Sequence, residues 1–182
     1  MDPSAERQEI VTAAVDLSFV IPVYNGSGSI GAVVDQIHEH FSHLDFEVIL
    51  VNDGSTDNSE QVCRALVEQH PEKVRLVHLA RNFGEHNAVL AGMNHASGRY
   101  VATLDDDGQN PPREVLPMYD VIRAGDYDVV FGRYRVKRHS GFRNLGSWIN
   151  DRVANVVLKK PRDLYLSSFK VMNRFMVDEI TR

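Results

Sequence analysis

The sequence of 182 residues lacks several features that would point to particular classes of protein. Its single cysteine, Cys63, excludes an internal disulfide and a zinc site built from cysteines. Cys63 lies among apolar neighbours, so we expect it in the core. Lysine and arginine total 20 against 25 aspartates and glutamates, and the net charge of −5 gives no reason to expect a nucleic-acid partner.

Long apolar runs are also missing. No stretch approaches the roughly 18 apolar residues of a membrane span, and residues 1–16 contain no apolar core of signal-peptide length. We therefore expect a soluble polypeptide. With 43% hydrophobic residues, the chain is long enough to form one compact domain with a substantial core.

Apolar segments with strand character alternate with segments of helical periodicity along most of the chain. The strands are continuously apolar, as in sheets covered on both faces, so the pattern predicts an α/β fold with a mostly parallel sheet and helices on both faces. Ser29 is a candidate helix cap, and Pro117 predicts a break or kink in the last of these helices. The expected strands are 17–25, 46–53, 74–80, 99–105 and 127–132, and the expected helices are 30–41, 54–70, 84–97 and 112–125.

Polar clusters follow three of the expected strands: Tyr24-Asn25, residues 52–55 and residues 105–109. Open parallel sheets bind ligands beyond the carboxyl ends of their strands, at a switch point. Ordinary turns use the same residue types, and this alternative stays open for residues 52–55. The three adjacent aspartates in "VATLDDDGQNPP" are different, because a turn needs only one. They indicate Mg²⁺ or Mn²⁺ carrying a substrate's phosphates.

Two other function classes remain open at this point. Gly26-x-Gly28-x-x-Gly31 fits the dinucleotide-binding spacing, and Asp53 ends the second strand where a ribose-binding acid would lie, so an NAD-type oxidoreductase is one alternative. A dehydrogenase gives no reason for three consecutive aspartates, however. A non-catalytic nucleotide-binding module is the other alternative, and it leaves the basic segment after the fifth strand unexplained.

That basic segment is "GRYRVKRHSGFRN", residues 132–144. It holds five arginines and lysines in a chain that is acidic overall. A solvated loop would explain it, as would contact with an anionic membrane surface. The segment also suits a phosphate site, because guanidinium groups match phosphate oxygens.

The order of "FVIPVYN", "VILVNDGSTD", "LARNFGEHNAVLAGMNHASGRYVATLDDDGQNPP", "VVFGRY" and "DLYLSSFKVMNR" resembles family 2 glycosyltransferases of the GT-A fold, which is Rossmann-like. Within that family it is similar to the branch that moves a sugar from a nucleotide onto a polyprenyl phosphate, such as dolichyl or undecaprenyl phosphate. The resemblance covers nearly the whole chain. It implies an N-terminal extension at 1–16 and a catalytic domain at 17–182, which we expect to be truncated at its C-terminal end.

The resemblance implies a donor site for a nucleotide-diphospho-sugar, with a UDP-sugar preferred over GDP-mannose. Asp105 and Asp107 match the Asp-x-Asp motif, and Gln109 matches a glutamine that contacts the metal together with Asp107. Asp105 would support the ion through water or the ribose. The positions implied to bind the nucleotide are Pro22, Tyr24, Asn25, Asp53, Asp105 and Asp106.

For the acceptor, the resemblance implies that Arg133, Arg143 and Ser147 contact a polyprenyl phosphate. Attack from the face opposite the leaving diphosphate would invert the anomeric carbon. If a saccharide hydroxyl accepts the sugar instead, as in cell-surface polysaccharide synthesis, Asp163 matches a proposed base that would take its proton. The implied location is the inner face of the membrane for the full-length protein, and an oligomer is compatible with the sequence.

The chain departs from the family pattern at several positions. Gly26 stands where relatives usually have Glu, which removes a carboxylate near the nucleotide. Asn52 replaces an Asp, Gly108 replaces a Leu, and Ser168-Phe169 stands in place of Gly-Phe or Gly-Cys before Lys170.

Overall fold

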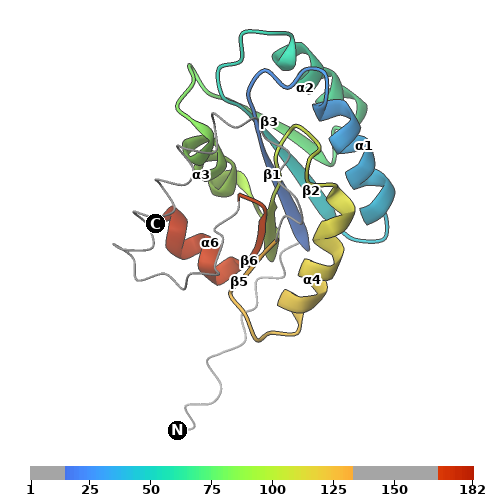
Figure 1. The fold of residues 1–182 in the computed structure, drawn as a ribbon, viewed down its shortest axis with the longest axis vertical. Helices are drawn as coiled ribbons and strands as arrows, with labels where there is room; N and C mark the ends of the chain where they lie inside the picture. The colour runs from blue at the N-terminus through green and yellow to red at the C-terminus, as the bar shows by residue number, and fades with distance from the viewer. Residues whose placement is uncertain (1–14, 133–167) are drawn as a thin grey trace, which may run out of the picture.

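A computed structural model describes residues 15–132 and 168–182, which form a six-stranded sheet with the strand order β3-β2-β1-β4-β6-β5 (Figure 1). β1, β2, β3 and β4 are parallel to one another, whereas β6 runs antiparallel to both β4 and β5. The prediction of a mostly parallel α/β sheet is confirmed. The strands are β1 Leu17–Val23, β2 Phe46–Asn52, β3 Val74–His78, β4 Tyr100–Thr103, β5 Val129–Phe131 and β6 Lys170–Asn173.

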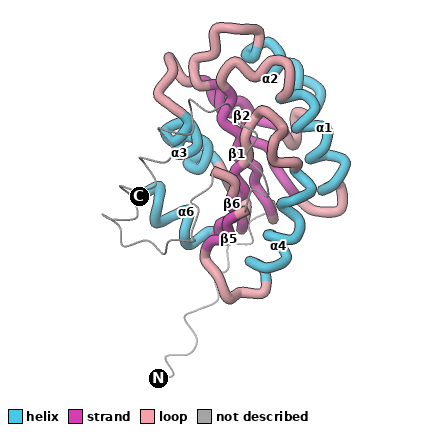
Figure 2. Tube along the Cα trace, in the orientation of Figure 1, coloured by secondary structure: helices cyan, strands magenta, loops and turns pink. Residues whose placement is uncertain are grey.

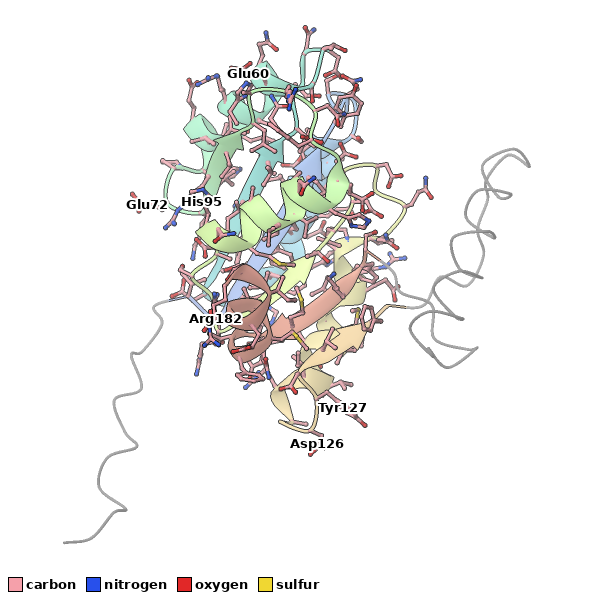
Figure 3. All side chains as sticks on the ribbon, turned by 90° about the vertical axis from the view of Figure 1, so that its left-hand side faces the viewer. Glu60, Glu72, His95, Asp126, Tyr127 and Arg182 are labelled. Carbon is pink, nitrogen blue, oxygen red and sulfur yellow. The ribbon has the colours of Figure 1, made fainter. Side chains whose placement is uncertain are left out.

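Helices cover both faces of the sheet, as the sequence predicted (Figure 2). α1, α2 and α4 lie on one face, whereas α3 and α6 lie side by side across the other, which faces the viewer in Figure 3. Within the described ranges, no helix has both the length and the apolar character needed to cross a membrane. The helices are α1 Ile30–Phe41, α2 Ser59–Gln69, α3 Glu85–His95, α4 Val115–Arg123 and α6 Arg174–Thr181, and a 3₁₀ turn, η1 Pro112–Glu114, precedes α4.

Successive side chains of the central strand β1 point to opposite faces of the sheet and contribute to two hydrophobic clusters, one under each helical layer. Phe19 and Ile21 of β1 belong to the larger cluster, with residues of α1 and α4, and Val20 belongs to the smaller one under α3. Cys63 is fully buried in the larger cluster, which confirms its predicted place in the core. Strands buried on both faces explain why the sequence shows continuous apolar runs.

Three local predictions need correction. β6 was not expected, and it enters the sheet between β4 and β5 as a strand of only four residues. Pro117 does not break α4, because it lies in the first turn, where a backbone N–H has no partner within the helix. Ser29 is the N-cap residue of α1, but its hydroxyl donates to the Gly26 carbonyl oxygen and does not cap the helix.

A buried carboxylate ties together the amino edge of the sheet, opposite the expected ligand site. Oε1 of Glu47 accepts hydrogen bonds from the Ser18 hydroxyl at 2.7 Å and from both the backbone N–H and the hydroxyl of Ser97 at 2.7 Å. Arg75 lies 3.5 Å from the other oxygen. Burial raises the pKa of Glu47, but these hydrogen bonds and Arg75 outweigh it and hold the pKa below the ordinary value of 4.5.

We expect Glu47→Gln to lower the free energy of unfolding by about 1–2 kcal/mol at neutral pH, because hydrogen bonds to a charged acceptor become neutral ones. A lowered pKa stabilises the fold above the ordinary value, and this stability is lost as the pH falls through the folded-state pKa. Urea unfolding at about pH 7 and about pH 3 should therefore show a smaller acid loss in the variant. Glu68→Gln, on an exposed part of α2, is the control. Equal acid losses in parent and variant would contradict the assignment.

Candidate functional site

The carboxyl edge of the sheet has a switch point between β1 and β4. From β1 the chain continues to β2 and β3 on one side, whereas β4 lies on the other side of β1. Loops that leave these strands therefore diverge around one position, which is where open parallel sheets bind ligands. Residues 24–29, which we call the nucleoside loop, follow β1, and residues 105–109, the acidic loop, follow β4.

Asn25 joins the nucleoside loop to the loop that follows β2. Its backbone has a φ of +56°, and its N–H donates to the Ser55 hydroxyl at 3.1 Å. Its side-chain oxygen accepts from the backbone N–H groups of Thr56 and Asp57, at 2.9 and 3.3 Å. Asn25, a predicted nucleotide-binding residue, therefore holds the two loops together in this structure.

Asp57 makes a second connection between these loops. One carboxylate oxygen accepts from the Ser59 N–H at 2.9 Å, at the start of α2, and the other accepts from the Ser27 N–H at 3.2 Å. The hydrogen bond from the Ser59 hydroxyl and those from the backbone lower the pKa of Asp57 to about 2. Sequence reasoning assigned Asp57 no role, although it follows Asp53 within the quoted "NDGSTD".

Asp53, predicted to hold the nucleoside, is 2% exposed at the end of β2. Its two carboxylate oxygens accept from the backbone N–H groups of Phe83 and Gly84, at 2.8 and 2.9 Å. Gly54 permits this close approach, because a Cβ there would lie 2.4 Å from the carbonyl carbon of Arg81 and its φ is +63°. In this structure, therefore, Asp53 anchors the loop that leads into α3.

Two aromatic side chains are exposed at the same edge. Tyr24 in the nucleoside loop is 49% exposed, and Phe83 is 46% exposed with the Arg81 guanidinium 4.9 Å from its ring centre. Aromatic faces exposed beside polar loops suit stacking on a planar base. Pro22, another predicted nucleotide-binding residue, is buried in β1 opposite Val51 of β2, so its contribution is to the strand that carries Tyr24.

The three aspartates of the acidic loop have three different environments. Asp105 is partly buried and accepts from the side chains of Asn110 and Ser168, each at 2.9 Å. Asp106 accepts from the Tyr24 N–H at 3.1 Å, and burial, with the charges of its two neighbours, raises its pKa to about 6. Asp107 is exposed and accepts from the Gln109 N–H at 2.9 Å.

Asp107 and Gln109 are the residues that could hold a divalent ion. Both are exposed and carry hard oxygen donors, two residues apart in one turn. No group of three or more His, Cys, Asp and Glu side chains among the described residues is arranged to hold a metal by itself. A sparse donor set of this kind fits Mg²⁺ or Mn²⁺ that a substrate's phosphates also bind.

A group of polar residues next to Asp105 was missed from the sequence. Ser168, just before β6, donates to Asp105, and its carbonyl oxygen accepts from the Thr103 hydroxyl. Glu85 begins α3 nearby, and burial together with the charge of Asp105 raises its pKa. Burial lowers the pKa of Lys170, whereas the charge of Glu85 raises it. Only antiparallel β6 brings Ser168 and Lys170 here, and no sequence pattern predicted that strand.

The predicted acceptor-phosphate residues Arg133, Arg143 and Ser147, and the predicted base Asp163, lie outside the described residues. Gly132, the first residue of the basic segment, is described. It follows β5 at the carboxyl edge, and its N–H donates to the Phe169 carbonyl oxygen at 3.0 Å. The basic segment therefore starts at the same edge of the sheet as the acidic loop.

Known proteins resemble this chain in sequence over most of its length. A family model described as Glycosyl transferase family 2 matches residues 18–181. An undecaprenyl-phosphate 4-deoxy-4-formamido-L-arabinose transferase of Serratia proteamaculans is 39% identical over 87% of this chain and 48% of its own length. The transferase of the same name from Yersinia pestis is 36% identical over 87% of this chain and 47% of its own. The chain spans about half the length of these relatives.

Solved structures share the fold at lower identity. Glucosyl-3-phosphoglycerate synthase from Mycobacterium tuberculosis, in complex with Mn²⁺, UDP and glucosyl-3-phosphoglycerate, superposes with a TM-score of 0.69 at 22% identity, over 90% of this chain and 58% of that one. TarS from S. aureus gives a TM-score of 0.62 at 21% identity, over 91% of this chain and 49% of that one. These likenesses confirm the predicted fold class.

The family match decides between the alternatives that the sequence left open. It favours a glycosyltransferase over both an NAD-type oxidoreductase and a non-catalytic nucleotide-binding module. The relatives confirm the resemblance to transferases that use a polyprenyl phosphate. The chain belongs to glycosyltransferase family 2.

Proposed function

We propose that this domain, residues 17–182, is the catalytic part of a metal-dependent inverting glycosyltransferase that moves a sugar from a UDP-sugar to a polyprenyl phosphate. One observation carries the donor half of the proposal. The Tyr24 N–H is hydrogen-bonded to Asp106, so the nucleoside loop and the acidic loop meet across the switch point. A nucleoside beside Tyr24 would then place its diphosphate near Asp107 and Gln109.

Asp107 and Gln109 would hold Mg²⁺ or Mn²⁺, which neutralises the charge that develops on the leaving diphosphate. Asp105 would stay fixed by Asn110 and Ser168 and orient the ribose or a bound water. The Mn²⁺ and UDP of the glucosyl-3-phosphoglycerate synthase, a neighbour in fold alone, support this choice of ion and nucleotide.

The acceptor half rests on charge and on the relatives. A phosphate acceptor is already largely anionic at neutral pH, because its second pKa is about 6, so it needs positioning more than a base. The basic segment that starts at Gly132 supplies cations for that task, with Arg133, Arg143 and Ser147 as the proposed contacts. The curated relatives are named for transfer to undecaprenyl phosphate. A lipid acceptor would bring the reaction to the membrane, and we propose its inner face as the location of the full-length protein.

We expect Arg133→Ala to lower kcat/KM for transfer to undecaprenyl phosphate by about ten- to a hundredfold, which corresponds to the loss of one charge-assisted hydrogen bond. The measurement is transfer of radiolabelled sugar to undecaprenyl phosphate in mixed micelles, with neutral saccharides tested in parallel. Affinity for UDP with Mn²⁺ should stay nearly unchanged.

Arg64→Ala, on the exposed surface of α2, is the matched control and should transfer like the parent. If the Arg133 variant transfers to lipid phosphate as well as the parent does, or if only saccharides accept sugar, the proposed acceptor is wrong. Asp163 would then be the residue to test as a base.

A further inference from the structure

Gly26 leaves open a space that the Asp106 carboxylate fills. A Cβ built on Gly26 would lie 2.2 Å from Oδ2 of Asp106 and 2.8 Å from its Cγ. Both distances are far below van der Waals contact, so any side chain at position 26 would displace Asp106. The absence of a side chain on one loop is therefore matched to the position of a carboxylate on another.

Asp106 uses this space to continue the contact between β1 and β4 beyond the point where their backbones separate. The backbone ladder reaches the bond from the Leu104 N–H to the Val20 carbonyl oxygen, at 3.1 Å. Beyond this hydrogen bond, the segments that follow β1 and β4 turn to opposite sides of the switch point. The Asp106 side chain spans the gap and accepts from the Tyr24 N–H at 3.1 Å.

The other side of Gly26 is fixed by α1. The Gly26 carbonyl oxygen accepts from the Ser29 and Ile30 N–H groups, each at 3.1 Å, and from the Ser29 hydroxyl. The start of α1 thus holds the glycine in place, and Asp106 packs against its open face. A shift of either residue would move the nucleoside loop relative to the acidic loop.

We propose that Asp106 is a positioning residue that sets the separation between Tyr24 and Asp107, and that this position requires glycine at 26. The inference rests on the proposed function only where it connects this separation to binding of a nucleotide with its metal. It assigns Asp106 no contact with the ion. Its role is the hydrogen bond across the switch point.

The test is a double-mutant cycle of Gly26→Ala and Asp106→Ala, read by calorimetric binding of UDP with and without Mn²⁺. We expect each single variant to weaken UDP binding in the presence of Mn²⁺ by about tenfold, the value of one hydrogen bond to a charged acceptor. The double variant should bind no more weakly than the poorer single variant, because both changes remove the same contact. Asp106→Asn should stay within about threefold of the parent, since its amide oxygen still accepts from Tyr24.

Gly31→Ala is the matched control, because it lies just beyond the loop, in the first turn of α1, and a Cβ there would meet nothing within 4 Å. It should bind like the parent. Additive losses, an Asp106→Asn variant as weak as Asp106→Ala, or unchanged binding by Gly26→Ala would each overturn the positioning role.

Thermal unfolding without ligand separates this inference from the proposed function. Each single variant should lower Tm by about 4 °C, and the double variant should lower it no further. If the parent binds no UDP but the Tm losses of the variants are coupled in this way, the result would contradict the proposed function and support the contact between the loops. If the parent binds UDP with Mn²⁺ but the Tm losses of the two single variants simply add, the inference alone would be overturned.

Discussion

Asp107→Ala should abolish the Mn²⁺-dependent part of UDP binding and lower kcat/KM for sugar transfer by about a thousandfold. In the proposed function this carboxylate is one of two protein groups that hold the ion, so its loss removes the group that stabilises charge on the leaving diphosphate. Asp107 is exposed, and its contact within the loop is to Gln109, so the fold itself should tolerate the change. Thermal shift with UDP and with UDP plus Mn²⁺ measures the binding part.

Asp126→Ala is the control for this experiment. Asp126 is an exposed carboxylate before β5, at the amino edge of the sheet, and Figure 3 shows it at one end of the molecule. Its loss changes the net charge equally but should leave the Mn²⁺ response intact. A Mn²⁺ response that persists in the Asp107 variant would place the ion at other residues.

Asp53→Ala should lower the free energy of unfolding by about 3 kcal/mol, because it removes a carboxylate that is 2% exposed and accepts from the backbone N–H groups of both Phe83 and Gly84. For a domain of this size, the loss corresponds to a fall in Tm of about 6–12 °C. Hydrogen exchange should show the amides of residues 83 and 84 losing protection before those of β1. The loop into α3 would then no longer be held at the site.

Asp45→Ala is the matched control for stability. Asp45 pairs with Lys73 at 2.8 Å on the surface, and its carboxylate is largely exposed, so its loss should cost about 1 kcal/mol or less. Equal stabilities for the two variants would mean that Asp53 does not anchor the loop. It would then be free for the nucleoside contact that the resemblance implies.

The sequence was sufficient to predict the layers of this fold because each central strand is buried on both faces. Mostly apolar runs such as residues 17–23 and 46–52 have few other interpretations, and α1, which lies between them, buries apolar residues at helical spacing. β6 could not be predicted in this way. It has four residues, begins with Lys170, and owes its place to pairing with β4 and β5, which are distant in sequence.

In the site, too, features that follow from local sequence could be predicted, whereas features that depend on contacts between distant residues could not. The clustering of the acidic loop and the nucleoside loop at one edge follows from the strand order alone, so the sequence predicted it. The separate roles of the aspartates depend on contacts between loops. Asp106 meets Tyr24, which is 82 positions away, and Asp53 meets Phe83, so no local pattern distinguishes a positioning carboxylate from a ligand.

The insertion of β6 between β4 and β5 also has a consequence for the order in which the chain assembles. The parallel strands β1 to β4 all lie within residues 17–103 and can pair as soon as that part of the chain has been synthesised. β5 is made next, but its partner within the described residues, β6, begins only at Lys170. Among the described residues, the outer edge of β4 therefore has no strand to pair with until β6 has been synthesised, and an unpaired strand edge can pair with other chains.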